Sequence, residues 1–412
     1  MSNRRWLVLL PVIFVTYSLA YLDRANYSFG AAAGMAADLR ISSAASSFLG
    51  ALFFLGYFAF QIPGAIYAQR KSVKRLVFAG LILWGLLAGA TGIISDLRLL
   101  YADRFLLGVV ESAVLPALLI LLARWFTAPE RARVSAILIL GNPVTLLWMS
   151  VLSGYLANSL GWRGMFVAEG VPPILWAFVW WRLVADRPSE ARWVSDAERL
   201  ALEAQLAAEQ RRLAPVRDYR AAFRSPVVIL LAAQYFFWSI GVYGFVLWLP
   251  SILKMHQTGI VAVGWLSAIP YLAAVIAMLI VSTFSDRLRR RKHAIWPFLL
   301  LGALAFYASY AFGMAHFWFG FGALVVAGAA MYAPYGPFFA YMPEVLPSNV
   351  AGGAIALVNG MGALGSFTGT YAVGLLNGLT GNPDLSYIAM AVALIISTGL
   401  TLLLPERRAG IG

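Results

Sequence analysis

The sequence predicts an all-α membrane protein with twelve transmembrane helices in two halves of six. Of the 412 residues, 61% are hydrophobic and 12% are charged, a composition too apolar for a soluble globular protein of this length. Apolar stretches of about 20 residues, the length that crosses a hydrocarbon core about 30 Å thick, recur along the whole chain. A long polar segment over 186–225 separates the first six stretches from the last six.

The apolar stretches give the transmembrane helices in chain order. They run over 6–30, 45–68, 76–96, 99–122, 134–158, 165–185, 226–252, 263–284, 294–314, 318–342, 353–377 and 386–404. The first stretch is longer than the apolar region of a secretory signal and lacks a small-residue cleavage site, so we interpret it as a span. The predicted units are a bundle over 1–185, a cytoplasmic linker over 186–225 and a second bundle over 226–412.

The linker carries the signature of an amphipathic surface helix. Ser195 can serve as the N-cap, Asp196 and Glu198 follow it, and the Ala- and Leu-rich stretch ends at Arg211 and Arg212. Acids near the start and bases near the end complement the helix dipole. We expect this helix to tether the bundles along the membrane face, and a site for a regulatory partner is the alternative.

The basic residues orient the helices. With the N-terminus in the cytoplasm, the cytoplasmic segments hold 25 of the 31 Lys and Arg residues, and the external loops hold Arg40, Arg98, Arg163 and Lys254. Positive charge collects on the cytoplasmic side of membrane proteins, so both termini are predicted to be cytoplasmic. The net charge of +13 then suits loops that face an anionic leaflet, and a nucleic-acid partner is not expected.

The sequence gives little support to metal, thiol or enzyme chemistry. The chain has no cysteine, and its three histidines, His256, His293 and His316, fall far apart at predicted helix ends or loops. The motifs H-E-x-x-H, G-x-S-x-G and G-x-x-x-x-G-K-[ST] do not occur. We therefore expect no metal, no cofactor, no enzyme activity and no ATP-driven pump.

One loop is repeated in the two halves. The first half has QIPGAIYAQRKSVKRL at 61–76 and the second has VSTFSDRLRRRK at 281–292, each a cytoplasmic turn with an arginine followed by a basic cluster. Repeated halves are typical of secondary transporters, in which the substrate site lies between the halves near the bilayer midplane.

Several motifs, in the same order, resemble those of one family. They are YLDRANYSF (21–29), RFLLGVVESAVLPA (104–117), RWFTAPERAR (124–133), GWRGMFVAEGVP (161–172), QYFFWSIGVYGFVLWLPSIL (234–253) and ALVNGMGALGSFTGTY (356–371). By these motifs the chain resembles the major facilitator superfamily over nearly its whole length. Within it, the chain resembles the anion:cation symporter family, which includes bacterial carriers of galactonate and hexuronates and animal sialin-type carriers. The resemblance implies the major facilitator fold and a place in the bacterial inner (cytoplasmic) membrane.

The first copy of the repeated loop departs from the superfamily's pattern. Gln69 and Ser72 stand where the superfamily usually has Asp and Gly, whereas Asp286 and Arg287 keep the pattern in the second half. The usual acid supports a conformational latch, so the departure puts the latch of the first half in question.

Two basic residues lie well within the predicted spans, each with an acid near it. The basic ones are Arg24 and Arg104, and the nearest acids are Asp23 and Glu111. Each charge inside the membrane costs at least about 2.5 to 3.5 kcal/mol on insertion scales, so such residues usually face a cavity, pair with one another and mark a pathway. We expect the four groups to converge in one cavity. A salt-bridge clamp between the first and fourth spans is the structural alternative.

The spacing on the fourth span is informative. Arg104 and Glu111 are seven residues apart, so they share one stripe of the helix at heights about 10 Å apart. Gly108 lies between them and leaves room for the arginine stem to lie down toward Glu111, or for a substrate. Glu111 and Asp23 are at similar depths, about 12 and 10 Å from the external helix ends. Asp103 is expected to be a solvated residue at a helix end.

An arginine suits a carboxylate substrate because its planar fork donates two parallel hydrogen bonds and keeps its charge. A carboxylate in the same cavity can act as a proton switch. In the family, the positions that match Asp23 and Glu111 are implicated in proton coupling, and the position that matches Arg24 in binding the substrate carboxylate. By the same resemblance, Arg104 is the partner that tunes Glu111.

Further polar groups can bind the hydroxyls of a substrate. The predicted substrate-binding residues are Arg24, Arg104, Tyr21, Tyr57, Asn142, Gln234 and Asn359. For Tyr57 and Gln234, a plain hydrogen bond between helices is equally open. Glu169 is expected to be structural. The aromatic residues Trp238, Tyr243, Phe245 and Trp248 are expected mostly to pack and to anchor at the membrane interface, with one or two of them lining the cavity as the alternative.

The sequence thus predicts a proton-coupled symporter that imports a small hydroxylated organic anion, with a sugar acid such as an aldonate or hexuronate as the leading class, by alternating access. The alternative is an exporter or facilitator of the same fold for another organic anion, such as a tartrate-like or aromatic carboxylate. The two intramembrane arginines favour an anion over a cationic drug. The expected partners are the anion, protons and the lipid bilayer, and the chain is expected to be a monomer.

Overall fold

The computed structural model describes residues 4–191, 193–212, 224–256, 259–288, 290–313, 316–346, 351–380 and 384–405. Every regular element in these residues is a helix, so the all-α prediction is confirmed. Arg407 and Arg408, and residues 213–223 of the predicted linker, lie outside the described residues.

The first six predicted spans form long helices joined by short turns. The elements are α1 (Arg4–Ala32), α2 (Met35–Asp38), α3 (Ser43–Arg70), α4 (Val73–Ile93), α5 (Leu97–Glu111), α6 (Val114–Trp125) and α7 (Ala128–Leu183). Helix α7 covers two predicted spans. Between them, the backbone at Gly161 leaves the helical region, with φ of 68° and ψ of 175°. Glycine adopts a positive φ without steric strain, so the chain reverses there. We call residues 128–160 the first arm of α7 and residues 162–183 its second arm.

The later part of the chain follows the same plan. After η1 (Pro188–Glu190) and the linker helix α8 (Asp196–Arg212) come α10 (Pro226–Lys254), α11 (Ile260–Leu288), η2 (Arg291–Ala294), α12 (Trp296–Gly313), α13 (Phe317–Tyr332), α14 (Tyr335–Val345), α15 (Ala351–Thr380) and α16 (Asp384–Leu403). The Ser195 hydroxyl accepts a 3.3 Å hydrogen bond from the backbone N–H of Glu198, as expected of an N-cap at the start of α8.

Two spans are each interrupted near their middle, and a proline accounts for both breaks. The fourth span breaks between α5 and α6, and the tenth between α13 and α14. Pro116 has no N–H to donate to the carbonyl group of Ser112, and Pro337 has none for Ala333. The repeat of the two halves therefore extends to this break. In the first half, the break directly follows Glu111.

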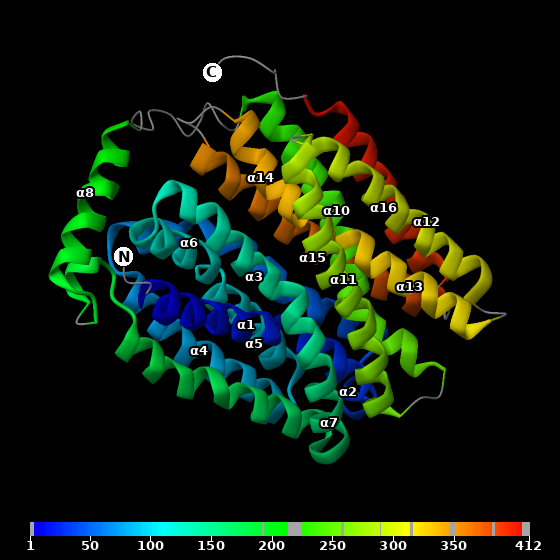
Figure 1. Cartoon of the computed structure of the whole chain (residues 1–412). Helices are drawn as coiled ribbons and strands as arrows, with labels where there is room; N and C mark the ends of the chain where they lie inside the picture. The colour runs from blue at the N-terminus through cyan, green and yellow to red at the C-terminus, as the bar shows by residue number, and fades with distance from the viewer. Residues whose placement is uncertain are drawn as a thin grey trace.

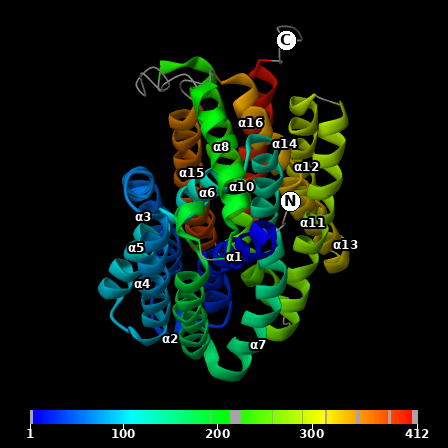
Figure 2. The same ribbon diagram turned by 60° about the vertical axis from the view of Figure 1, so that its left-hand side comes forward.

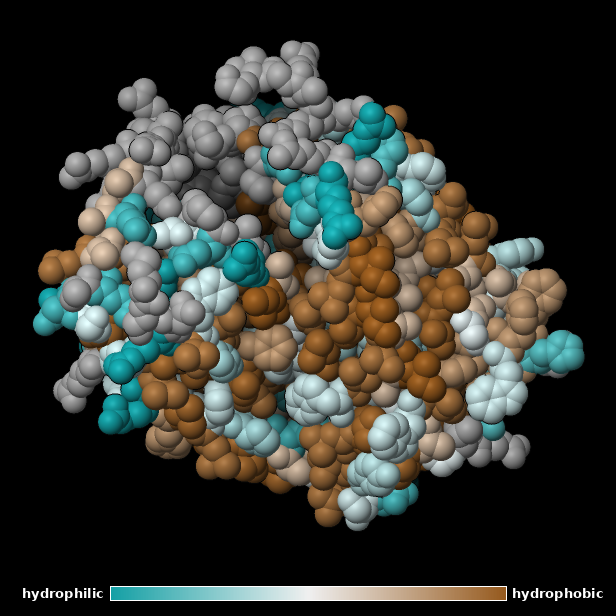
Figure 3. Space-filling view, viewed as in Figure 1, coloured by the Kyte–Doolittle hydropathy of each residue, from teal (hydrophilic) through white to brown (hydrophobic). Residues whose placement is uncertain are grey.

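The helices fit a multi-pass membrane protein. Among the described residues, ten helices are long and apolar enough to cross a membrane. One of these ten contains both arms of α7, and the glycine-rich α15 has 30 residues, enough to cross about 30 Å of hydrocarbon. Apolar side chains cover much of the face seen in Figure 3, while hydrophilic ones gather toward its upper and left edges. Such an apolar outer surface suits contact with lipid.

Helices α1 to α7 and helices α10 to α16 form two groups that lie side by side (Figures 1 and 2). The groups meet most extensively along the pairs α1 with α10, α3 with α15, and α7 with α11, and α14 also contacts α7. We call the end of the molecule that carries the turn at 33–42 the outer end, after its predicted location. Near it, an added Cβ on Gly374 of α15 would lie 1.7 Å from Ser47 Oγ, and one on Gly264 of α11 would lie 2.6 Å from the Ser150 carbonyl oxygen. The seam between the groups is therefore tightly packed near the outer end.

Helix α3 shows how the opposite, inner end differs. Its residues 46–57 are nearly all buried. Closer to the inner end, five large apolar side chains each expose more than a third of their surface, namely Phe58, Phe60, Ile62, Ile66 and Tyr67. Helix α3 is thus covered along its outer stretch and loses that cover toward the inner end.

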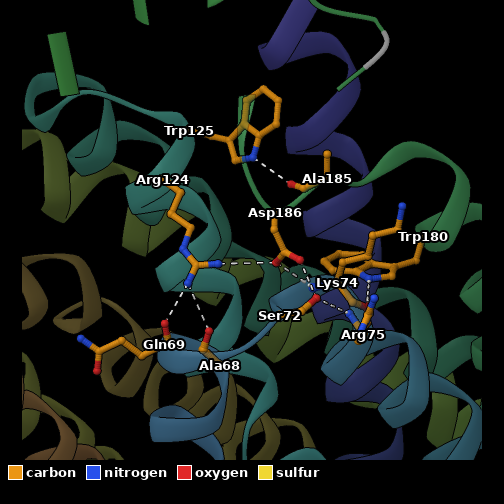
Figure 4. Close-up of polar contacts among 10 residues, drawn as sticks. All are labelled: Ala68, Gln69, Ser72, Lys74, Arg75, Arg124, Trp125, Trp180, Ala185 and Asp186. Atoms are coloured by element: carbon orange, nitrogen blue, oxygen red, sulfur yellow. Dashed lines mark hydrogen bonds and ion pairs between the residues drawn. The ribbon is translucent and has the colours of Figure 1, made fainter. Parts of the chain in front are cut away.

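At the inner end, Asp186 connects three elements of the first group (Figure 4). Its carboxylate accepts a 2.5 Å hydrogen bond from the Ser72 hydroxyl and a 3.1 Å bond from the backbone N–H of Lys74 in the first turn of α4. Arg124, at the end of α6, lies 3.5 Å from the same carboxylate. Arg124 also donates a 3.1 Å hydrogen bond to the carbonyl oxygen of Gln69 near the end of α3.

Gln69 and Ser72, where the loop departs from the superfamily's pattern, both take part in this network. Gln69 takes part through its backbone, and Ser72 through a hydroxyl that also caps α4 by accepting from the N–H of Arg75 at 3.0 Å. The acid that contacts this loop is Asp186, which is 114 residues away from Ser72 in sequence.

Replacing Asp186 with alanine should destabilise the protein, because the variant loses acceptors for Ser72, Lys74 and Arg124 together. Hydrogen bonds to a charged group contribute about 1.5–3 kcal/mol, and we expect a loss in this range. Thermal unfolding in detergent checks it, with Asp186→Asn intermediate because its amide oxygen still accepts. Asp196→Ala is the control, since that aspartate side chain is 83% exposed and forms only a surface ion pair. Unfolding of Asp186→Ala at the wild-type temperature would contradict the prediction.

Candidate functional site

Asp23 and Arg24 are adjacent on α1, yet they face different partners. Successive residues of a helix are about 100° apart, so neighbours in sequence cannot share a face. Both side chains are buried. Asp23 accepts a 3.3 Å hydrogen bond from Asn26 Nδ2 on its own helix, whereas Arg24 faces α5. The acid and the base therefore belong to two separate contacts.

Arg24 forms an ion pair with Glu111 of α5. Arg24 Nε lies 3.4 Å from Glu111 Oε2, and both groups are buried. The guanidinium carbon of Arg24 also lies 4.5 Å from the ring centroid of Tyr57 and 5.4 Å from that of Tyr21. Aromatic faces at this distance attract a cation, and more strongly when water is excluded. Tyr21 and Tyr57, both predicted as substrate-binding residues, thus form part of the cradle of Arg24.

Arg24 is the hydrogen-bonded partner of Glu111, while Arg104, which is expected to tune Glu111, interacts with it through its charge. Gly108, which was expected to leave room for the arginine stem, is where α3 crosses α5: an added Cβ there would lie 1.9 Å from a backbone carbonyl oxygen of α3. The guanidinium of Arg104 lies over the ring of Tyr27 instead, 5.1 Å from its centroid. With α3 and α5 in close contact at Gly108, it is Arg24 that forms the ion pair with Glu111.

The expectation that Asp103 is a solvated helix end is wrong. Helix α5 begins at Leu97, so Asp103 lies well inside it, and its side chain is buried. It accepts a 2.6 Å hydrogen bond from the Thr91 hydroxyl of α4. The hydropathy pattern placed the start of this helix two residues late, and the fold supplies the partner on α4.

Glu169, on the second arm of α7, is buried close to the Asp23 contact. Its Oε1 accepts a 2.6 Å hydrogen bond from the Ser153 hydroxyl on the first arm, so the bond joins the two arms. The Asn26 side chain lies within hydrogen-bonding reach of the Glu169 carboxyl group as well as of Asp23. The contact with Ser153 fits a structural role for Glu169. Its second carboxylate oxygen, Oε2, is buried without a hydrogen-bond partner among the described residues.

The second group of helices contributes tyrosines that the sequence analysis did not select. The Tyr243 hydroxyl of α10 lies 3.0 Å from the Tyr21 hydroxyl, which connects the two groups of helices. Its ring packs edge-on against Phe54 of α3. Tyr332 and Tyr335, on either side of the break in the tenth span, stack on each other with centroids 5.4 Å apart. The sequence does not single out Tyr243 among the four aromatic residues of this span, because helix periodicity does not show which face of α10 meets α1.

The remaining predicted polar residues lie in different places. Asn142, on the first arm of α7, is buried and lies against the Tyr17 hydroxyl. Gln234 is buried on α10, its backbone carbonyl accepts from the Ser397 hydroxyl, and no partner of its side-chain amide is found among the described residues. Asn359 is half-buried on α15, next to Gly360, where an added Cβ would lie 3.7 Å from Gln61 Oε1.

Gln61 of α3 was missed by the sequence analysis. It is buried, and its Oε1 has no hydrogen-bond partner among the described residues. It follows Tyr57 by four residues, so the two share one face of the helix. A polar residue at this spacing inside an apolar helix was the signal that could have identified it.

The unmatched polar atoms of the site indicate what it can bind. Within the described part of the chain, Arg24 Nη2 and Arg104 Nε and Nη2 are buried donors without partners, and Glu111 Oε1 and Asp23 Oδ2 are buried acceptors without partners. A buried donor or acceptor left unmatched costs about 1–3 kcal/mol, and more when it is charged. Anionic oxygens would accept hydrogen bonds from the unmatched N–H groups of the arginines, and protons would bind to the unmatched oxygens of the carboxylates. The described residues contain no group of three or more His, Asp and Glu side chains that could hold a metal ion.

Long apolar helices in two packed groups, with charged residues buried among them, are typical of membrane transporters. The chain belongs to the Major Facilitator Superfamily, whose family model matches residues 13–370 and, in a second match, residues 254–411.

Several relatives are similar over nearly the whole chain. A quinolone resistance transporter of Acinetobacter baumannii is 30% identical over 407 residues, which cover 95% of this chain and 92% of the relative. A putative tartrate transporter of Agrobacterium vitis is 31% identical over 405 residues, covering 96% and 89%. The D-galactonate transporter of Escherichia coli is 25% identical over 434 residues, covering 98% and 96%.

Solved structures share the fold at low sequence identity. A D-xylose-proton symporter superposes with a TM-score of 0.80 at 14% identity, covering 98% of this chain and 99% of that one. A bacterial homologue of the human lysosomal transporter Spinster superposes with a TM-score of 0.77 at 18% identity, covering 98% and 97%. At these identities the likeness shows the fold alone.

Proposed function

We propose that this protein is a proton-coupled symporter of the bacterial inner membrane that imports a small hydroxylated organic anion by alternating access. Sugar acids, such as aldonates and hexuronates, are the leading substrate class. The proposal rests above all on the buried ion pair between Arg24 and Glu111. The guanidinium of Arg24, at the seam between the two groups of helices, has an N–H group without a partner among the described residues.

Arg24 can couple the two ligands because it can serve only one carboxylate well at a time. A substrate carboxylate that takes both N–H groups of the guanidinium fork draws Arg24 away from Glu111. A buried carboxylate without its partner is expensive to keep charged, so Glu111 then takes up a proton. Substrate and proton therefore bind together, and Glu111 returns to Arg24 when both have left.

The relatives support an organic anion as the substrate. One of those described above is named as a putative tartrate transporter and another as a D-galactonate transporter, and both of these substrates are hydroxylated carboxylates. The tyrosine hydroxyls of Tyr21, Tyr57 and Tyr243, together with Gln61, Asn142, Gln234 and Asn359, offer donors and acceptors for such hydroxyl groups. We assign substrate binding to this polar set around Arg24, with Arg104 as a second cation nearby.

The tightly packed outer end and the uncovered inner stretch of α3 match the inward-facing state of an alternating-access cycle. In that state, a ligand at Arg24 would exchange with the cytoplasm. Opening of the outer end requires the contacts of Gly374 and Gly264 to separate, since each is made against another helix of the opposite group.

Export is the second candidate function, because one relative is named as a quinolone resistance transporter. The direction of the coupled flux separates the two candidates. Uptake into right-side-out vesicles driven by an inward proton gradient supports import, whereas proton-driven accumulation in inverted vesicles alone supports export.

The substrate can be identified by a thermal-shift screen of the purified protein against tartrate, D-galactonate, gluconate, glucuronate and an aromatic carboxylate. A ligand at 100 times its Kd stabilises the folded state by about 2.7 kcal/mol. The absence of a shift with every hydroxylated carboxylate, beside a shift with a cationic compound, would refute the proposed substrate class.

Arg24→Lys should weaken binding of the carboxylate substrate by about tenfold or more, because lysine keeps the charge and loses the two-pronged fork. Isothermal titration with the anion selected by the screen measures the effect. Arg5→Lys is a matched control, since Arg5 pairs with Glu130 near the start of α1 and lies outside the proposed site. Equal affinity in the wild type, Arg24→Lys and Arg24→Ala would remove the anchor role.

Glu111→Gln should abolish uphill uptake in proteoliposomes while substrate exchange across the membrane continues, because glutamine imitates the permanently protonated acid. Counterflow of labelled substrate measures exchange, and uptake under an imposed proton gradient measures coupling. Asp196→Asn, on the linker helix, is expected to match the wild type in both assays. Accumulation against a gradient by Glu111→Gln would show that Glu111 is not the essential proton carrier.

Uptake of a monoanion should be electrogenic, with more than one proton per substrate. Glu111 loses its ion pair when Arg24 turns to the substrate. Asp23 accepts a hydrogen bond from Asn26 and, among the described residues, none from an arginine. Burial therefore favours the protonated form of both acids in the loaded state. A potential of 100 mV would then add about 2.3 kcal/mol of driving force for each net charge moved. Uptake at equal pH on both sides, with a potassium diffusion potential that is negative inside, tests this. If the potential has no effect, one proton accompanies each anion and Asp23 is not a second carrier.

A further inference from the structure

A second polar cluster lies beside the Arg24 site and is not needed to hold the substrate. It consists of Asp23 and Asn26 on α1, and Glu169 and Ser153 on the two arms of α7. Asp23, Asn26 and Glu169 have exposures of 0%, 1% and 2%. Counted along the helices at 1.5 Å per residue, Asp23 lies about 13 Å from the end of α1 at Ala32, and Glu169 about 12 Å from the turn at Gly161. The two acids therefore lie in one layer, toward the outer end.

The cluster has an excess of acceptors. Asn26 Nδ2 donates to Asp23 Oδ1 at 3.3 Å, and the Ser153 hydroxyl donates to Glu169 Oε1 at 2.6 Å. Three further oxygen atoms are buried without a donor among the described residues, namely Asp23 Oδ2, Asn26 Oδ1 and Glu169 Oε2. Asn26 Oδ1 is the most informative, because an amide oxygen cannot gain a proton and must be matched by a donor from elsewhere.

We propose that Glu169 is a third proton-exchanging carboxyl group, which holds its proton toward Asn26 and passes it to and from Asp23. A protonated Glu169 would carry an O–H group able to donate to the unmatched Asn26 Oδ1, so that one proton would satisfy an oxygen of each residue. Asn26 then bridges the acids, with its oxygen accepting from Glu169 and its Nδ2 donating to Asp23. The proton would reach the Arg24 site from the outer layer through this bridge.

The charged surroundings of Glu169 are acidic on the side of α1 and neutral on the side of α4. Asp23 of α1 interacts electrostatically with Glu169, and also with Glu111 and Arg104 of α5. Helix α4 packs along the second arm of α7 through glycines, and an added Cβ on Gly170 would lie 2.6 Å from the Gly85 carbonyl oxygen. Between Arg75 and its end at Ile93, α4 has no ionisable side chain. No base on α4 therefore neutralises Glu169, and a proton does so instead.

The role in transport rests on the proposed proton coupling, but proton binding itself can be tested without a substrate. Infrared difference spectra of the purified protein between acidic and alkaline buffer report the carbonyl stretch of each buried carboxyl group that gains a proton. We expect Glu169→Gln to lack one band that the wild type shows. Glu169→Asp should keep a shifted band. Ser153→Ala should also keep the band, displaced because its hydrogen bond is lost, and Asp23→Asn should move the same band through Asn26.

A spectrum of Glu169→Gln identical to that of the wild type would overturn the proposal, as would a band that responds to NaCl in place of pH. Ser153→Ala separates proton exchange from a purely structural role, since it removes the bond between the arms and leaves the acid. If Ser153→Ala and Glu169→Gln lower the unfolding temperature equally and both keep the pH-dependent bands of the wild type, Glu169 is only a clasp between the two arms of α7.

The transport assay separates this inference from the proposed function. With D-galactonate or tartrate as the probe, wild-type uptake under a proton gradient should fall in Glu169→Gln by on the order of 100-fold, the lower end of what a positioned proton-transfer group contributes, while counterflow stays close to the wild-type rate. Wild-type uptake of an anion that ignores the proton gradient refutes the proposed coupling, whatever the spectra show. Full proton-driven uptake by Glu169→Gln refutes the relay alone.

Discussion

The cost of placing charge inside a membrane governs the arrangement of this site. Arg24 and Glu111 are both buried, and each is tolerable there only because the other lies 3.4 Å away and aromatic rings surround the guanidinium. Removal of one member of a buried pair typically costs 3–5 kcal/mol, because the remaining charge has no partner. A pair of this kind is stable when complete and unstable when broken, which is the property that a binding event can exploit.

Helix geometry turns the two neighbouring charges of α1 in different directions. Because Asp23 and Arg24 are consecutive, Asp23 accepts from Asn26 and interacts with Glu169, whereas Arg24 pairs with Glu111 of α5. The crossing of α3 over α5 at Gly108 then prevents Arg104 from lying along α5 toward Glu111. Two backbone constraints, the helical twist and a glycine crossing, thus determine which arginine meets which acid.

Prolines and glycines shape the scaffold around these contacts. The break after Glu111 repeats in the tenth span at Ala333, and both breaks lie four residues before a proline. The close contacts of Gly374 and Gly264 join the two groups of helices near the outer end, while α3 is uncovered toward the inner end. Asp186 holds the inner turns of the first group together without reaching the second group. Movement between the groups can therefore leave the interior of each group unchanged.

The sequence by itself determined the helical membrane class, the helix boundaries to within a few residues, and four of the buried charged residues, Asp23, Arg24, Arg104 and Glu111, because hydropathy and helix length are local properties. It also placed Arg24 and Glu111 in one site, although it assigned Arg104 as the partner of Glu111. Only the tertiary structure decided the pairing of Arg24 with Glu111, the burial of Asp103 against Thr91, and the approach of Tyr243 to Tyr21. It also brought Asp186 into contact with Ser72 of the 61–76 loop. Each of these contacts depends on how one helix is rotated against another, and residues far apart in sequence carry no local signal of that rotation.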